Sequence, residues 1–310
     1  MSEQFCDIGG GITLCYEQFG DPGETPVMLV MGLATQMIAW HDDFCEQLAG
    51  RGFHVVRFDN RDVGRSTHMD FAPPTRLQLL RRRPGPHQYT LSDLADDTMG
   101  LMRELGLAPA HVVGASMGGM IAQTLAAEHR ETVRSLVSIM SNTGSRWRGQ
   151  PAPPVYKYLL KGPPREREQF VERAAEIFGL IGTKGFGHDL DYVRERAELS
   201  YARGHDVAGG GRQLGAIIAS GDRTATLRKI EAPTLVIHGT EDLMIRPSGG
   251  RATARAIPGA RLWLVEGMGH DLPRQLWPRL IDAIAEHARG ADGAEPATAA
   301  QVTGLGPGSG

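Results

Sequence analysis

The chain has little cysteine, few aromatic side chains, no strong charge of either sign and no long hydrophobic run. Of its 310 residues, 3 are cysteines and 6% are aromatic, and the formal net charge at pH 7 is −3. The near balance of charge argues against nucleic acid or an anionic membrane as the main partner. Because no uncharged apolar run approaches the roughly 18 residues that a membrane span requires, none is expected.

The N-terminal residues and the cysteines bear on the cellular compartment. Met1 is followed by a polar stretch that lacks the basic and apolar segments of a secretory signal. Cys6, Cys15 and Cys45 are odd in number, and without such a signal free thiols are the default. We therefore expect a cytoplasmic protein. Its oligomeric state, monomer or homodimer, is left open by the sequence.

Two groups of ligand-binding motifs are missing. No G-x-G-x-x-G pattern follows the first expected strand, which argues against a nicotinamide cofactor. No His-x-x-x-His pattern, no glutamate-paired histidine cluster and no closely spaced cysteine pair is present, which argues against a metal site. We therefore expect neither a cofactor nor a metal.

What the chain does contain is an alternation of short apolar runs and amphipathic helical patterns. Several runs are apolar throughout, which favours parallel strands covered on both faces. The run at 12–19 ends in Gly20-Asp21-Pro22-Gly23 and is predicted to form an antiparallel hairpin with 27–31. The pattern predicts an α/β fold with a mostly parallel, doubly wound sheet of about eight strands. Its further runs span 53–58, 111–113, 133–140, 234–238 and 261–265.

The alternation breaks between residues 142 and 228, a stretch that holds several prolines and then charged helical patterns. Structureless connections of this length are rare in compact domains, so we expect a mainly helical cap, or lid, over the sheet. The core is then formed by 1–141 and 229–289. The last segment, 290–310, is rich in Ala, Gly, Pro and Thr and is predicted to be disordered.

The strongest local motif is Gly114-Ala115-Ser116-Met117-Gly118. It follows an apolar run and opens a helical pattern, so it predicts a strand, a sharp turn and a helix. The flanking glycines relieve the crowding of such a turn. The helix that begins just after Ser116 directs backbone N–H groups and its positive dipole end toward an oxyanion. This arrangement is typical of a serine nucleophile.

A nucleophilic serine requires a base, and the base requires an orienting carboxylate. Asp242 and His270 each follow an expected strand, in the chain order Ser, Asp, His. Of the 11 histidines, His270 combines a position after Asp242 with a glycine-rich loop. Glu241 is a neighbouring alternative to Asp242. The other usual position of the acid, after the run at 133–140, holds no carboxylate.

The oxyanion hole needs two N–H donors, and we expect the Met117 and Leu33 amides to supply them. Gly32 would let the backbone approach the substrate. Met37 and Trp40 follow this loop and are predicted to line the pocket entrance. Aromatic residues of the expected cap are enough for an apolar pocket roof, although for any single one packing of the cap on the sheet is the favoured role. They are Trp147, Tyr156, Tyr158, Phe170, Phe178, Phe186, Tyr192 and Tyr201.

Over residues 8 to 289 the chain resembles the α/β-hydrolase-fold serine hydrolases, and within them the bacterial aclacinomycin methylesterase group. The resemblance rests on Val30-Met31-Gly32-Leu33, on Phe58-Asp59-Asn60-Arg61-Asp62-Val63-Gly64-Arg65-Ser66 and on the serine motif. It implies a nucleophile at Ser116, an acid at Asp242, a base at His270 and oxyanion amides at Leu33 and Met117. It also implies a helical cap and no cofactor. We take 59–66 as a structural turn near the serine.

The function that these residues predict is hydrolysis of a small to medium hydrophobic or aromatic carboxylic ester through an acyl-enzyme, with a methyl ester as one option. The same triad would serve a cofactor-free perhydrolase or haloperoxidase-like enzyme, a lactonase or a C–C hydrolase. A dehalogenase is disfavoured because it needs a carboxylate in place of Ser116. A different class, an inactive hydrolase fold that binds a ligand, stays open as well.

Overall fold

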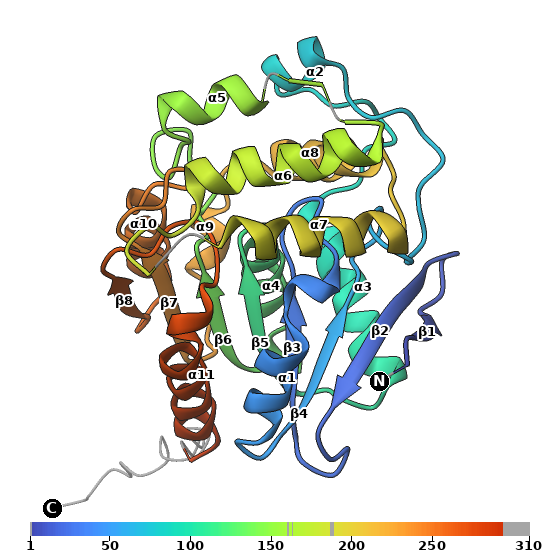
Figure 1. The fold of residues 1–310 in the computed structure, drawn as a ribbon. Coiled ribbons are helices and arrows are strands. Elements are labelled where there is room, and N and C mark those ends of the chain that lie inside the picture. Colours follow the sequence, from blue (N-terminus) through green and yellow to red (C-terminus); the bar gives the residue numbers. More distant parts are fainter. Residues whose placement is uncertain (1, 160, 163, 187–188, 294–310) are drawn as a thin grey trace, which may run out of the picture.

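The computed structural model describes residues 2–159, 161–162, 164–186 and 189–293. In this part of the chain one sheet of eight strands has the order β1-β2-β4-β3-β5-β6-β7-β8 (Figure 1). Strands β3 to β8 are all parallel, which confirms the predicted fold class. The strands are β1 (Gln4–Asp7), β2 (Thr13–Phe19), β3 (Thr25–Val30), β4 (Phe53–Phe58), β5 (Ala110–Ala115), β6 (Val133–Ile139), β7 (Thr234–Gly239) and β8 (Arg261–Val265).

The predicted hairpin between 12–19 and 27–31 is wrong. Strand β2 pairs antiparallel with β1 and with β4, whereas β3 lies on the other side of β4. The turn after β2 explains the difference. Gly20 has a φ of +85°, and a Cβ there would lie 2.5 Å from the carbonyl oxygen of Phe53, the first residue of β4. The chain therefore crosses the start of β4 before it enters β3.

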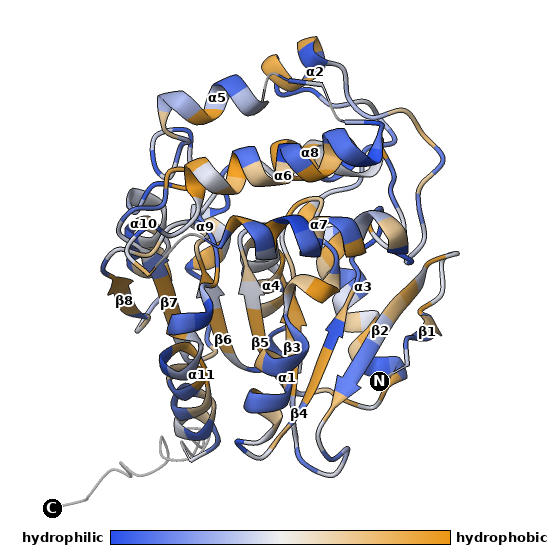
Figure 2. Cartoon of the chain, viewed as in Figure 1, coloured by the Kyte–Doolittle hydropathy of each residue, from blue (hydrophilic) through white to orange (hydrophobic). Residues whose placement is uncertain are grey.

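Helices cover both faces of the sheet. Figure 2 colours much of the central strands between these helices as hydrophobic. Neighbouring residues of β5 show the two layers, since Val112 belongs to a core cluster with Leu101 and Met120, whereas Val113 packs with Phe44 and Leu280. The layer helices are α1 (Asp42–Ala49), α3 (Leu91–Glu104), α4 (Met117–Glu128), α10 (Ser248–Ala256) and α11 (Trp277–Asp292). The short elements are η1 (Met37–Ala39), α2 (Arg76–Leu80), η2 (Arg130–Thr132) and η3 (Arg274–Leu276). Of these, α2 has no buried residue and lies beside the helices between β6 and β7 (Figure 1).

Between β6 and β7 the chain forms helices, most of which lie over the carboxyl ends of the parallel strands (Figure 1). We refer to residues 142–228 as the cap. Its two ends meet, because a Cβ on Gly144 would lie 2.0 Å from the carbonyl oxygen of Gly221. The Arg223 amide also donates to the Thr143 carbonyl at 2.7 Å. The helices here are α5 (Pro153–Leu159), α6 (Arg167–Ile181), α7 (Leu190–Arg203), α8 (Gly209–Ser220) and α9 (Thr224–Leu227).

The last helix continues further than the sequence predicts. We expected disorder from residue 290, but α11 runs to Asp292. Its end is held by the sheet, because Asp292 accepts hydrogen bonds from His111 and from Arg134, each at 3.2 Å. The rest of the expected tail, 294–310, lies outside the described residues. In the described chain no helix is both long and apolar enough to cross a membrane.

Candidate active site

Ser116 occupies the sharp turn between β5 and α4. Its φ of +56° and ψ of −118° are strained for a residue with a side chain, and its amide donates to the Ile139 carbonyl at 2.9 Å. The flanking glycines are required by close backbone contacts. A Cβ on Gly114 would lie 2.2 Å from the Gly118 carbonyl oxygen, and one on Gly118 would lie 2.1 Å from that of Val30. The turn is thus a nucleophile elbow in its geometry.

The structure brings Ser116, His270 and Asp242 together from three separate loops. The Nε2 of His270 lies 3.0 Å from the Oγ of Ser116, and its Nδ1 lies 2.7 Å from the Oδ2 of Asp242. Because a carboxylate only accepts, Nδ1 carries the proton and Nε2 is left to accept the serine hydroxyl. His270 is 9% exposed and Asp242 is 1% exposed, so the chain of hydrogen bonds is largely shielded from water.

The carboxylate of Asp242 is fixed by its own loop. Its Oδ1 accepts from the amides of Met244 and Ile245 at 2.9 and 2.8 Å, which leaves Oδ2 for His270. The alternative acid, Glu241, is exposed. A second histidine, His238, is buried beside Asp242, and burial lowers its pKa. The chain after β7 therefore presents one buried carboxylate to His270.

The loop after β3 reaches the nucleophile. A Cβ on Gly32 would lie 3.1 Å from the Cβ and 3.6 Å from the Oγ of Ser116, so the loop backbone is within contact distance of the elbow. Asn60 holds the preceding turn through a bond from its Nδ2 to the Met31 carbonyl at 3.0 Å. The Ala34 amide donates at 2.8 Å to Gln213 of the cap. Hydrogen bonds at Met31 and at Ala34 thus fix the backbone on either side of the Gly32-Leu33 pair.

The structure corrects the prediction for Met37 and Trp40. Both side chains are fully buried, so they do not line a solvent-accessible entrance. The ring of Trp40 packs on Phe44, with centroids 5.4 Å apart, and both belong to one core cluster. Sequence position alone placed these residues next to the oxyanion loop, but η1 turns them into the core.

The cap aromatics have several different environments. Trp147 and Tyr156 are 86% and 44% exposed, which removes them from an enclosed apolar roof. Phe170 and Tyr201 pack together between α6 and α7, with ring centroids 5.6 Å apart. Tyr192 lies under the guanidinium of a core residue, Arg274, at 4.3 Å. Packing within the cap and against the core therefore accounts for several of them.

The turn at 59–66 does brace this end of the sheet. Asp59 accepts from the amides of Met37 and Arg65 at 2.7 and 3.0 Å, and it pairs with Arg203 of the cap. Arg61 forms a two-pronged ion pair with Asp97 of α3. Ion pairs of this segment therefore connect it to the cap, through Arg203, and to α3, through Asp97.

In the described chain one group of side chains has the spacing of a metal site: Asp62, His68 and Asp206. Arg212 of α8 already occupies the space between the two carboxylates. Its Nε donates to Asp62 at 2.9 Å and its Nη2 donates to Asp206 at 2.6 Å. The group forms an ion-pair cluster between core and cap, in which the Arg212 guanidinium supplies the positive charge that faces both carboxylates.

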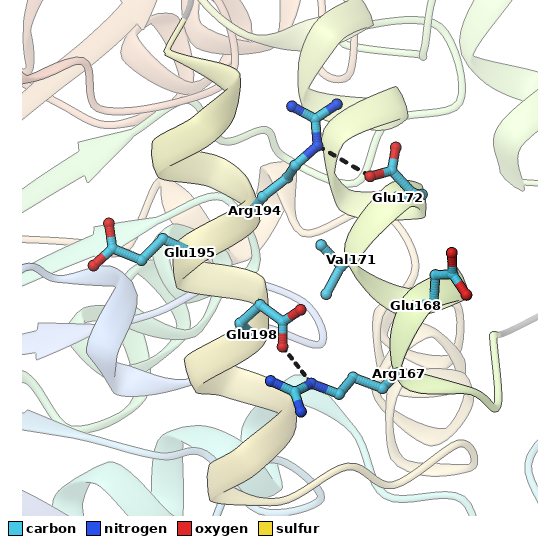
Figure 3. A pocket seen from close by; sticks show the side chains of 7 residues that line it. All are labelled: Arg167, Glu168, Val171, Glu172, Arg194, Glu195 and Glu198. Atoms are coloured by element: carbon cyan, nitrogen blue, oxygen red, sulfur yellow. Dashed lines mark hydrogen bonds and ion pairs between the residues drawn. The ribbon is translucent and has the colours of Figure 1, made fainter.

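A groove on the outer side of the cap runs between α6 and α7 (Figure 3). Ion pairs from Arg194 to Glu172 and from Arg167 to Glu198 cross it and tie the two helices together (Figure 3). None of the triad residues lines it. The groove is therefore a surface feature of cap packing and is separate from the candidate active site.

The parallel sheet, the helices on both of its faces and the elbow define the class of protein. The chain belongs to the alpha/beta hydrolase fold family, which matches residues 25–273. It is 31% identical to rhodomycin D methylesterase DauP of Streptomyces sp. (strain C5), over 90% of this chain and 96% of that protein. It is 27% identical to non-heme chloroperoxidase CPO-A1 of Kitasatospora aureofaciens, over 86% and 92% of the two chains.

Among solved structures, the enol-lactonase from Burkholderia xenovorans LB400 superposes with a TM-score of 0.71 at 23% identity. The match covers 92% of this chain and all of that one (100%). At this level of identity the superposition supports the fold alone. Together, the comparisons show an α/β hydrolase with relatives that are enzymes.

Sequence reasoning missed the cap residues that contact the catalytic loops. Thr183 is bonded to the loop of His270, and Gln213 is bonded to the loop of Gly32. No local motif marks either residue. Their partners are 86 and 179 positions away in the chain, so the contacts follow from the way the cap folds over the sheet.

Proposed function

We propose that this chain is a carboxylic ester hydrolase that uses Ser116, His270 and Asp242 as a catalytic triad. The observation that carries the proposal is the continuous hydrogen-bonded chain from Ser116 Oγ through both nitrogens of His270 to the buried carboxylate of Asp242. This geometry allows His270 to take the serine proton while Asp242 stabilises the imidazolium that results. A serine on a strained elbow in front of a helix N-terminus supports the same role.

The reaction proceeds by two acyl transfers. Ser116 Oγ attacks the ester carbonyl as its proton moves to His270 Nε2, and the carbonyl oxygen becomes an oxyanion. The Leu33 and Met117 amides are the proposed donors to that oxyanion. His270 then protonates the leaving alcohol, which departs and leaves an acyl-serine. Water, deprotonated by the same imidazole, attacks the acyl group and releases the carboxylic acid.

For the substrate we propose a methyl ester of a hydrophobic or aromatic carboxylic acid, with methanol as the alcohol released. The support is the 31% identity over nearly the full length to a rhodomycin D methylesterase. Because methanol is small, most of the recognition would fall on the acid part of the ester. Small-molecule substrates of this kind also agree with the near-neutral net charge.

The test is hydrolysis of p-nitrophenyl esters and aromatic methyl esters by the wild type and by Ser116→Ala, with labelling by a fluorophosphonate. We expect turnover and labelling in the wild type and a loss of turnover of at least about 10⁴-fold in the variant. Labelling without turnover of any of these esters would favour a lactone or peracid reaction on the same triad. Neither labelling nor turnover would favour an inactive, ligand-binding hydrolase fold.

A further inference from the structure

The loop that carries His270 is bonded directly to the cap. The His270 amide donates to the carbonyl of Ile181, the last residue of α6, at 2.8 Å. The Gly269 amide donates to the Oγ1 of Thr183 at 2.8 Å. The backbone amides of Gly269 and His270 are therefore both bonded to cap residues.

Thr183 both accepts and donates hydrogen bonds in this contact between the cap and the His270 loop. Its hydroxyl accepts from Gly269 and donates to the Oδ1 of Asp271, and its amide donates to the same Oδ1 at 2.9 Å. One threonine thus binds the residues immediately before and after His270. Its side chain is fully buried, so water does not replace these bonds when they are lost.

The fit between the two segments is close. A Cβ on Gly269 would lie 2.5 Å from both the Ile181 carbonyl oxygen and the Gly182 carbonyl carbon. The loop therefore contacts the cap backbone without an intervening side chain. A displacement of the end of α6 would be passed to the loop of His270, because packed interfaces of this kind do not deform continuously.

We propose that Thr183, a residue of the cap, is a positioning residue for His270. This inference rests on the proposed function, because it assigns the cap a part in setting the geometry of the proposed triad. Both nitrogens of His270 must stay within hydrogen-bond distance of their partners, and misplacement by about 1 Å can cost about 10²-fold in rate. The hydroxyl of Thr183 holds the loop in the position that meets this requirement.

The experiment compares Thr183→Val, which keeps the shape but removes the hydroxyl, with Thr183→Ser, which keeps the hydroxyl. Thr98→Val is the matched control, because Thr98 is also fully buried and its hydroxyl bonds to the Leu94 carbonyl in α3, at 2.9 Å. The readouts are kcat and KM with p-nitrophenyl acetate, the rate of fluorophosphonate labelling of Ser116, and the melting temperature.

We expect Thr183→Val to lower kcat and the labelling rate by about 10- to 100-fold with KM changed less than about twofold. Thr183→Ser should recover kcat to within about threefold of the wild type. Thr98→Val should lower the melting temperature and leave kcat unchanged. A wild-type kcat in Thr183→Val, or an equal loss in Thr183→Ser, would overturn the proposal, as would an equal loss in Thr98→Val.

If Thr183→Val does not fold, Asp271→Ala takes its place, since Asp271 is only partly buried and supplies the acceptor for both Thr183 donors. The expected loss in kcat is similar, and a wild-type kcat would overturn the proposal. A wild type that neither hydrolyses esters nor reacts with the fluorophosphonate overturns the proposed function itself. A fully active wild type with unaffected Thr183 variants overturns the positioning role alone.

Discussion

His238 lies beside Asp242, with its Nε2 3.4 Å from the Oδ2 of that carboxylate. The same nitrogen is 2.7 Å from the carbonyl oxygen of Ile245, so it carries the ring proton. Its Nδ1 has no partner in the described chain, and a Cβ on Gly250 would lie 2.5 Å from it. His238 is therefore a buried neutral donor next to Asp242, while His270 is the histidine that reaches Ser116.

This burial predicts a dependence of stability on pH. Burial lowers the pKa of His238 in the folded state, whereas in the unfolded chain it is about 6.5. The unfolded state therefore binds more protons below about pH 6.5, and the stability present above that pH is lost as the pH falls toward the folded pKa. Each pH unit in this window costs about 1.4 kcal/mol from this one group.

His238→Gln removes this titration and keeps an amide donor for the Ile245 carbonyl. We expect the free energy of unfolding of the variant to fall less steeply between pH 7 and pH 5 than that of the wild type, as measured by urea unfolding at each pH. Buried His111 and His287 also have lowered pKa values and keep part of the slope in both proteins. Parallel slopes in the two proteins would contradict the prediction.

Asp242→Asn tests the orientation of the base. An asparagine keeps the bonds that Oδ1 accepts from Met244 and Ile245, but it loses the charge that stabilises the imidazolium of His270. We expect kcat for a p-nitrophenyl ester to fall by about 10⁴-fold with little loss of stability. Activity within tenfold of the wild type would assign the acid role to another residue.

Gly32→Ala tests the approach of the oxyanion loop to the nucleophile. The new methyl group would lie 3.1 Å from the Ser116 Cβ and 3.3 Å from the Ala115 carbonyl oxygen, inside a strained turn that has little room to move. We expect kcat to fall by about 10²-fold, the usual cost of a displaced oxyanion donor. Gly290→Ala, which meets open space in α11, is the control and should leave kcat unchanged.

Gln213→Met tests the second contact between the cap and a catalytic loop. Gln213 is fully buried, accepts from the Ala34 amide and donates to the Arg61 carbonyl at 2.8 Å each. Methionine fills a similar volume without these bonds, and Ala34 has a φ of +53° that the bond helps to maintain. We expect kcat to fall by about tenfold or more at nearly constant KM. An unchanged kcat would show that the oxyanion loop holds its own conformation.

Local sequence predicts that Ser116, Asp242 and His270 lie at one edge of the sheet, and in the structure hydrogen bonds join their side chains, while their catalytic roles stay a prediction. Ser116, Asp242 and His270 each follow an apolar strand pattern, and parallel strands bring their carboxyl ends to one edge. The order of the strands in the sheet is harder to predict. The turn at Gly20 indicates that the chain reverses, but it does not indicate which strand pairs with β2. The burial of Trp40 was missed for a related reason, since its position in the chain does not reveal that η1 turns it inward.

The sequence predicts a cap over 142–228 from its prolines and from the loss of the strand pattern, but it does not predict the contacts of this segment. Thr183 follows the end of α6 and Gln213 lies in α8, and nothing local distinguishes either polar residue. Their partners lie in distant loops, so only the folded chain reveals the bonds. Residues that act through tertiary contacts of this kind leave no pattern that periodicity or capping rules detect.

Because Gly144 and Gly221 lie in contact, the inserted chain leaves and re-enters the core at one place. A descendant protein can lengthen, shorten or exchange the inserted helices while the sheet and its nucleophile stay in place. Such an exchange must still supply partners for the buried core carboxylates, because Arg203 pairs with Asp59 and Arg212 pairs with Asp62.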